Sequence, residues 1–182
     1  MIEQLSQLMN QFGQEAVVKN NSVPNELNDK VIKEAQSSLY SGLQDLIQDG
    51  GAAKFATLLQ GNNASKADNP IVKGLIDKVS NNLNKNCNLD SGASNNVANN
   101  LIPQVLGSLL GKAKDPNQKG FELSDIIGSL TNGRGNDIMG ILAKMGLDQN
   151  GDGKLDIQDA MAALSGKGGK KAGGLLGKFF GK

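Results

Sequence analysis

The sequence contains no histidine and no tryptophan among its 182 residues. Without histidine the chain lacks the most common general base, so Ser-His-Asp and Cys-His catalytic arrangements are excluded. Zinc sites with imidazole ligands are excluded for the same reason. Aromatic residues make up only 3% of the chain, which disfavours the base-stacking surfaces that bind RNA or single-stranded DNA.

Cysteine and excess charge are also scarce. The single Cys87 can form neither an intramolecular disulfide nor a thiolate metal cluster, and we expect it to be a small, semi-buried residue. A formal net charge of +1 argues against nucleic-acid binding by the chain as a whole. The first residues carry no basic segment followed by an apolar run, and no stretch is long enough to span a bilayer, so the expected location is the cytoplasm.

Helical periodicity is what the sequence does contain. Apolar residues recur at helical spacing from Ile2 to Leu164, and no run alternates as a strand would. The pattern predicts an all-α, multi-helix bundle. Gly13 is expected to stop the first helix, and Pro24 is expected to lie near the start of the long helix that follows.

The boundaries of the middle helices are predicted by proline, serine and asparagine. Pro70 opens one helix, whose end we expect to fray at residues 81–88 because asparagine is a weak helix former. Ser91 or Ser94 is expected to cap the next helix. Pro103 lies inside that helix and is expected to kink or break it near Asn99.

Residues 148–159 have the spacing of an EF-hand calcium loop. Oxygen side chains occupy the first, third, fifth, ninth and twelfth positions, with glycine at the sixth and an apolar residue at the eighth. A hard dication needs several oxygens on a small sphere, so the chain must wrap round it, and Gly153 permits the sharp turn. The predicted ligands are five side chains and one backbone carbonyl, that of Lys154: Asp148, Asn150, Asp152, Lys154, Asp156 and Asp159.

The last ligand of this loop departs from the usual pattern. Asp159 takes the place of a glutamate, and its shorter side chain reaches less easily for bidentate contact. Ca²⁺ is the expected cofactor of this loop. Because the Asp159 side chain is short, we expect its affinity for Ca²⁺ to be reduced, or Mg²⁺ to be an alternative ion. Aspartate at this position resembles dockerin loops, although dockerins carry two such loops and one is visible here. A surface turn without metal is the alternative reading, because Asp, Asn and Gly favour turns.

The tail, residues 165–182, is rich in glycine and lysine and contains no acidic residue. As a helix it would bring four large apolar side chains into one strip: Leu175, Leu176, Phe179 and Phe180. We expect this strip to be buried against its own domain or a second subunit, since an exposed strip would be a sticky patch. A flexible tail is the alternative, because each glycine costs about 1 kcal/mol in a helix, and contact with a membrane surface is a third reading.

Three segments together resemble the YidB-like family of small bacterial proteins of unknown function. They are Asn-Ser-Val-Pro-Asn-Glu at 21–26, Gly-Ser-Leu-Leu-Gly at 107–111, and the metal loop ahead of a Gly/Leu-rich C-terminus. The resemblance implies an all-helical fold and a bacterial source, but no activity. The predicted organisation is a helical domain at 1–120, a helical unit with the metal loop at 121–164, and the tail at 165–182.

The expected function is that of a non-enzymatic, metal-stabilised structural or interaction module that binds another protein or a second copy of itself. A calcium-responsive regulator is the main alternative, although a single loop disfavours it because sensor EF-hands usually act in pairs. An enzyme that uses carboxylates alone is disfavoured by the lack of histidine and of any nucleophile motif.

Overall fold

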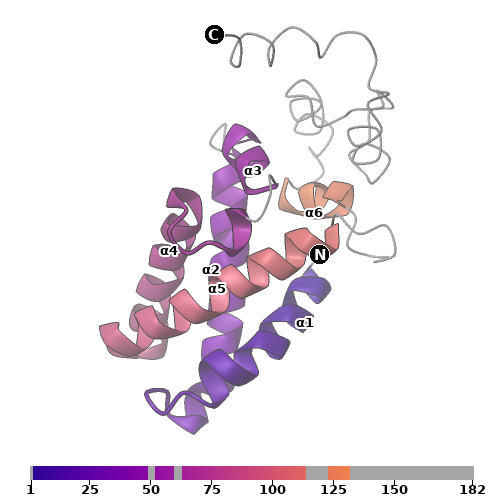
Figure 1. Ribbon diagram of the computed structural model, residues 1–182. Coiled ribbons are helices and arrows are strands. Elements are labelled where there is room, and N and C mark those ends of the chain that lie inside the picture. The colour runs from indigo at the N-terminus through magenta and orange to yellow at the C-terminus, as the bar shows by residue number, and fades with distance from the viewer. Residues whose placement is uncertain (1, 49–51, 60–62, 114–122, 132–182) are drawn as a thin grey trace, which may run out of the picture.

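Every element in the described part of the chain is helical. The structure, a computed structural model, describes residues 2–48, 52–59, 63–113 and 123–131, and these residues contain no strand (Figure 1). Its helices and helical turns are, in chain order, α1 (Ile2–Gly13), the π-helical turn η1 (Gln14–Val18), the 3₁₀ turn η2 (Asn25–Leu27), α2 (Asn28–Gln48), α3 (Ala52–Leu59), the 3₁₀ turn η3 (Asn63–Ser65), α4 (Pro70–Cys87), α5 (Ser91–Ala113) and α6 (Leu123–Leu130). The all-α prediction is confirmed.

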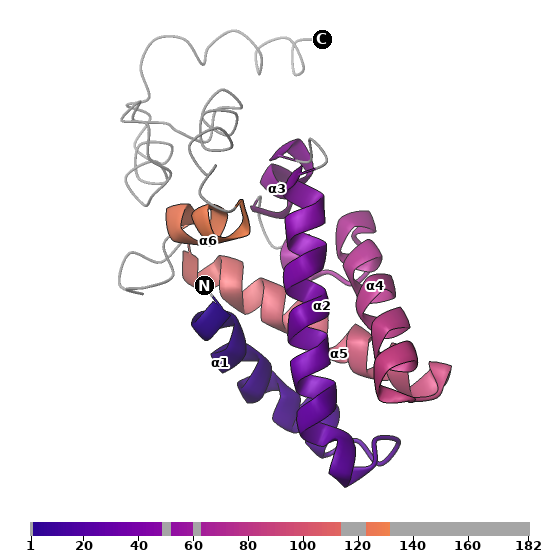
Figure 2. The same cartoon turned by 180° about the vertical axis from the view of Figure 1, so that it is seen from behind.

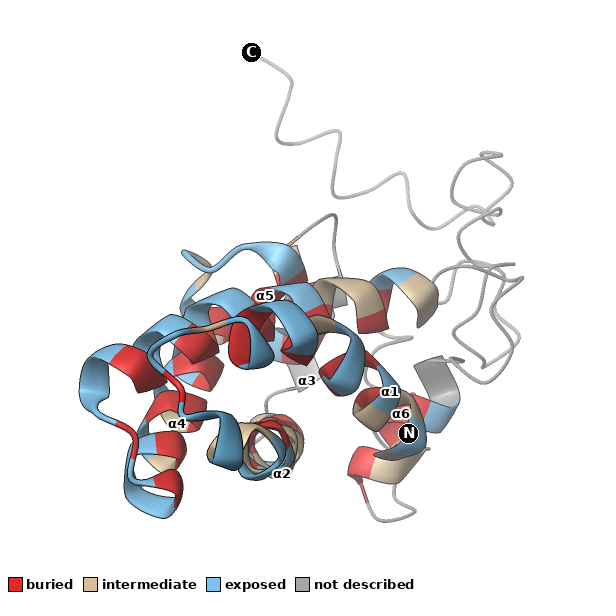
Figure 3. Cartoon of the chain, turned by 90° about the horizontal axis from the view of Figure 1, so that it is seen from below, coloured by how far each residue is buried: buried red, intermediate tan, exposed pale blue. Residues whose placement is uncertain are grey.

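The two longest helices, α2 and α5, lie on opposite sides of the bundle (Figure 2, Figure 3). α1 and α4 each pack against both of them, while α3 and α6 pack against α2. This arrangement turns the apolar stripes of the helices toward one another, as their periodicity predicts. The largest fully buried side chains form one core: Leu5, Leu8, Met9, Leu39, Leu43, Ile47, Phe55, Leu58, Leu83, Leu101, Ile102 and Leu106.

Gly13 ends α1 but does not stop the helical path of the chain. Its backbone is right-handed (φ −64°, ψ −26°), and the chain continues directly into η1. The predicted end of α1 at Gly13 is confirmed, although the chain continues in a π-helical turn. Glycine is needed because α2 comes close: a Cβ at this position would lie 2.9 Å from Cδ1 of Ile32.

The asparagines at the end of α4 do not fray it. α4 continues to Cys87, and Asn88 then ends the helix in the left-handed conformation (φ 55°), which asparagine tolerates better than most residues. The side chains hold the helix end to its surroundings: Nδ2 of Asn86 donates to Oε1 of Glu34 at 2.8 Å, and Nδ2 of Asn84 donates to the carbonyl of Leu89 at 2.6 Å. The predicted fraying is wrong because these tertiary hydrogen bonds outweigh a weak helix propensity.

Asp90, and not Ser91 or Ser94, caps α5. Its Oδ1 accepts a hydrogen bond from the backbone N–H of Ala93 at 2.9 Å, and its carbonyl accepts from the N–H of Ser94 at 2.9 Å. Ser91 is the first residue of the helix, and Ser94 lies inside it, fully buried. The cap therefore sits one residue earlier than predicted.

We expect Asp90→Ala to lower the free energy of unfolding by about 1 kcal/mol, because it removes the acceptor of an N-terminal N–H group of α5. Urea unfolding followed by circular dichroism measures the change. Ser91→Ala is the matched control and should leave stability nearly unchanged. An equal loss in both variants would contradict the assignment of the cap.

Pro103 does not break α5, so the break, one of the two effects predicted for this proline, is wrong. The helix runs without interruption from Ser91 to Ala113 and includes Pro103, which is buried. Proline removes the N–H that would bond to the carbonyl of Asn99. The residues around it, Ile102 and Val105, are fully buried in the core. Tertiary packing thus offsets the missing hydrogen bond.

Candidate functional site

The predicted metal ligands and the apolar tail lie outside the described residues. This applies to the whole loop 148–159 and to the tail 165–182. Within the described ranges, no group of three or more His, Cys, Asp or Glu side chains is placed to hold a metal ion. The loop and the tail therefore stay predictions, and so does the division of the chain at residues 120 and 164.

The described element that precedes the metal loop in the chain is α6, and it is anchored to the bundle. Its residues Ile126, Ile127 and Leu130 are buried in the common core. The hydroxyl of Tyr40 in α2 donates to the carbonyl of Ser129 at 2.8 Å. α6, the last described helix before the loop, is thus held against α2.

A continuous series of polar contacts, here called the polar seam, joins α2 to α4. At one end, Oε1 of Glu34 accepts from Nδ2 of Asn86 and from Oγ of Ser38, at 2.8 Å and 3.1 Å. In the middle, Nδ2 of Asn82 donates to Oγ of Ser38 at 2.9 Å. The spacing of these residues is helical on both elements, so each contact falls one turn further along the helix pair.

The polar seam ends in an ion pair between Lys78 and Asp45, and Nζ of Lys78 also donates to Oγ of Ser41 at 3.0 Å. The Asp45 side chain is 62% exposed, so this pair contributes little to stability. Its consequence is local: the charge of Lys78 is matched by a carboxylate from the neighbouring helix.

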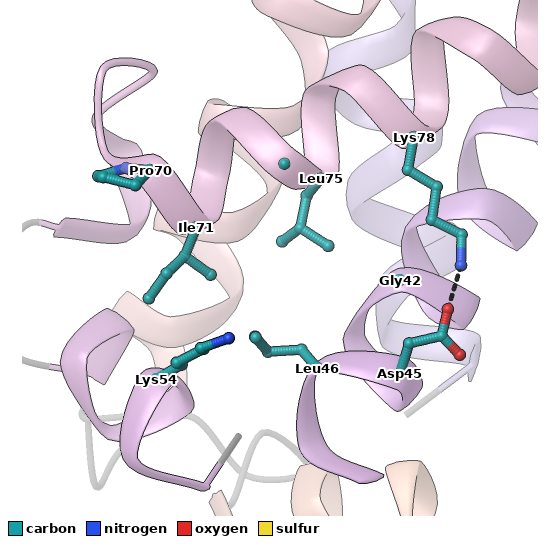
Figure 4. A pocket seen from close by; sticks show the side chains of 9 residues that line it. Gly42, Asp45, Leu46, Lys54, Pro70, Ile71, Leu75 and Lys78 are labelled. Carbon is teal, nitrogen blue, oxygen red and sulfur yellow. Dashed lines mark hydrogen bonds and ion pairs between the residues drawn. The ribbon is translucent and has the colours of Figure 1, made fainter. Parts of the chain in front are cut away.

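Beyond this ion pair, α2 and α4 separate and α3 closes the gap, which leaves a hollow of about 370 Å³ (Figure 4). This space between α2, α3 and α4 is referred to below as the hollow. It is lined by residues from three helices: Gly42, Asp45, Leu46, Lys54, Pro70, Ile71, Gly74, Leu75 and Lys78.

Two glycines set the shape of the hollow. At Gly42, a Cβ would come within 2.7 Å of Cδ2 of Leu75, so α4 packs closely on α2 there. At Gly74, one turn before Lys78 on α4, a Cβ would meet nothing within 4 Å. Gly42 thus allows the helices to touch, while Gly74 leaves the wall of the hollow open.

The side chains around the hollow are apolar on α4 and mixed on the facing side. Ile71 and Leu75 face the hollow from α4, and Leu46 and Lys54 extend toward each other from α2 and α3 (Figure 4). Among the described residues, Lys54 has no hydrogen-bond or ion-pair partner. The hollow therefore combines an apolar wall with a lysine that no described residue pairs with.

A second polar surface, formed by asparagine amides, lies on the exposed side of α5. Nδ2 of Asn99 and Nδ2 of Asn100 each donate to the carbonyl four residues earlier, at 2.8 Å. Nδ2 of Asn20, which follows η1, donates to Oδ1 of Asn96 at 3.0 Å. The amides of Asn99 and Asn100 thus bond within α5 itself, and the amide of Asn20 links the end of η1 to α5.

Cys87 is buried at the end of α4, as expected for a small hydrophobic residue. Burial raises the pKa of its thiol, and the nearby Glu34 carboxylate raises the pKa further, while Lys30 lowers it. Both the burial and the direction of the shift keep the thiol protonated and unreactive near neutral pH.

Sequence reasoning missed the hollow. The pairing of Asp45 with Lys78 was not predicted either. The available signal was glycine inside helical segments, at Gly42 and Gly74, because an internal glycine often marks a close packing contact.

Comparison with family models, with curated proteins and with solved structures gives no match to this chain. Within the described ranges, no helix has both the length and the apolar content needed to cross a membrane.

Proposed function

We propose that the chain is a non-enzymatic, metal-stabilised interaction module. In this proposal the helical bundle is the scaffold, a cation orders the residues after α6, and the apolar tail binds a second copy or another protein. We also propose membership of the YidB-like family, on the residues at 21–26 and 107–111 quoted above.

The observation that carries the proposal is the residue pattern at 148–159. The helix that precedes this loop, α6, is anchored to α2. Four aspartates lie within these twelve positions, and they repel one another unless a cation binds between them. Because Ile127 is fully buried and Ser129 is bonded to Tyr40, ordering of the loop would be tied to the bundle through α6. Metal binding would then add to the stability of the whole molecule.

Calorimetric titration with Ca²⁺ tests this proposal. The full chain should bind one Ca²⁺ per molecule, and Asp148→Ala should lose most of the binding heat, because it removes the first ligand of the loop. Saturating Ca²⁺ should raise the melting temperature of the wild type and leave that of Asp148→Ala unchanged.

Asp77→Ala is the matched control for this titration. Asp77 is an exposed acid on α4, outside the loop, and its removal should not alter the binding of Ca²⁺. The absence of heat from both Ca²⁺ and Mg²⁺ with the wild type would sink the proposal.

The alternative function is that of a calcium-responsive regulator. The anchoring of α6 on α2 supports it, because a change at the loop would reach the bundle through the bond between Tyr40 and Ser129. Size-exclusion chromatography with light scattering, in EDTA and then in Ca²⁺, distinguishes the structural module from the regulator. Assembly that is the same in both buffers supports the structural module, whereas a change in shape or mass on adding Ca²⁺ supports the regulator.

A further inference from the structure

We propose that the hollow between α2, α3 and α4 binds a small amphipathic anion, a carboxylate with an aliphatic body. This inference concerns the bundle itself and does not depend on the metal loop. It rests on the size of the hollow, on its apolar wall and on the charges at its edge.

The size of the hollow suits one small molecule. Its volume of about 370 Å³ falls in the range of known small-molecule sites, which is about 300–1,000 Å³. Its lining comes from three helices, so it is a concave site and not a groove along one element. A short aliphatic chain would fill it without movement of the bundle.

The wall of the hollow suits an aliphatic body. Ile71 and Leu75 present branched apolar side chains from α4, and Leu46 faces them from α2 (Figure 4). Leu46 and Ile71 are only partly buried by the protein, so a ligand would remove further apolar surface from water. The open space at Gly74 gives the ligand access to the backbone of α4.

The charges around the hollow select an anion. Lys78 is matched by Asp45, so these two groups contribute no net charge. Lys54 extends into the hollow from α3 (Figure 4) and has no partner among the described residues. A carboxylate beside Lys54 would supply the missing counter-charge, and an ammonium head would be repelled.

The N-terminus of α4 is not part of the proposed recognition. Oδ1 of Asn69 already accepts from the N–H groups of Ile71 and Val72, at 2.9 Å and 3.4 Å. Those donors are therefore occupied, and among the described residues that line the hollow Lys54 remains to hold the head of the ligand.

Calorimetric titration of the full chain with decanoate, below its micelle concentration and in EDTA, tests the proposal. EDTA prevents the formation of calcium soaps. The wild type should bind decanoate at one site and should bind the cationic decyltrimethylammonium at least about ten-fold more weakly, because the second head is repelled by Lys54. Decanol, which has no charge, should lie between them.

Two variants change the site without touching the core. Lys54→Glu should weaken decanoate binding at least about ten-fold, since it replaces an attraction by a repulsion. Gly74→Leu should abolish binding, because its side chain would occupy the hollow and a Cβ there meets no atom within 4 Å. Thermal melts of both variants establish that they fold.

Matched controls are available for both changes. Lys73→Glu reverses an exposed charge on α4 that does not line the hollow. Gly111→Leu fills open space on α5, away from the hollow. Both controls should bind decanoate as the wild type does.

Three outcomes would overturn the proposal. One is no binding of decanoate to the wild type at millimolar concentration, and another is equal binding of the anionic and cationic probes. The third is binding that appears only when the chain is truncated after Ser165, since the hollow would then be the site of the tail and not of a free anion.

Discussion

We expect Leu101→Ala to lower the free energy of unfolding by about 2–5 kcal/mol, the range for removing a large aliphatic side chain from a packed core. Leu101 has no exposed surface and lies midway along α5. α5 packs against α1, α4, η1 and η3, so the cavity would be surrounded by several elements. Such a site collapses poorly, which places the expected loss in the upper part of the range.

Urea unfolding of the full chain measures this loss. Asn100→Ala is the matched control, because Asn100 is the adjacent residue but its side chain is exposed. Its change should stay within about 0.5 kcal/mol, as is usual for surface substitutions. A loss below about 1 kcal/mol for Leu101→Ala would show that α5 is not packed as described, since buried leucines do not give so small a value.

The second large effect is expected at Gly107. A Cβ at this position would lie 2.8 Å from Cβ of Ser65 and 3.4 Å from its Cα, so any side chain pushes against the backbone of η3. Gly107→Leu should lower the free energy of unfolding by about 1–3 kcal/mol, because overpacking moves a backbone segment. The same change should loosen the contact between α5 and η3, which hydrogen exchange at residues 63–66 would detect.

Gly111→Leu is a control for which we expect the opposite change in the free energy of unfolding. It lies one turn after Gly107 on α5, and a Cβ there meets nothing within 4 Å. Gly111→Leu should therefore raise stability slightly, by up to about 1 kcal/mol, through helix propensity alone. Equal effects at both glycines would refute the close approach of η3.

Positions of helices could be predicted from the sequence because one property, the spacing of apolar residues, fixes them. α4 begins at Pro70, and Ile126, Ile127 and Leu130 form the buried face of α6, as the pattern predicts. The end of α4, where the prediction failed, depends in part on a partner distant in sequence. Asn86 remains helical because Glu34 accepts its amide, and no local pattern contains that information.

The hollow could not be predicted from the sequence for the same reason. Its charge balance depends on the pairing of Lys78 with Asp45, two residues on different helices. Its open wall depends on the lack of any atom within 4 Å of a Cβ at Gly74, which only the packing determines. The metal loop is the opposite case, since all its predicted ligands are consecutive in sequence and their spacing alone suggests the ion.

The packing of α1 against α5 determines when the bundle can form during synthesis. Synthesis produces α1 before α5, which ends at Ala113. Yet α5 is one of the helices that pack against α1, whose buried residues include Leu5, Leu8 and Met9. The bond between Asn20 and Asn96 joins residues 76 positions apart. The entropy cost of closing so long a loop is only slightly greater than that of closing a shorter one, because the cost grows with the logarithm of loop length. The consequence is one of time: α1 can rest on α2 as the chain emerges, but its apolar face stays incompletely covered until α5 has been synthesised as well.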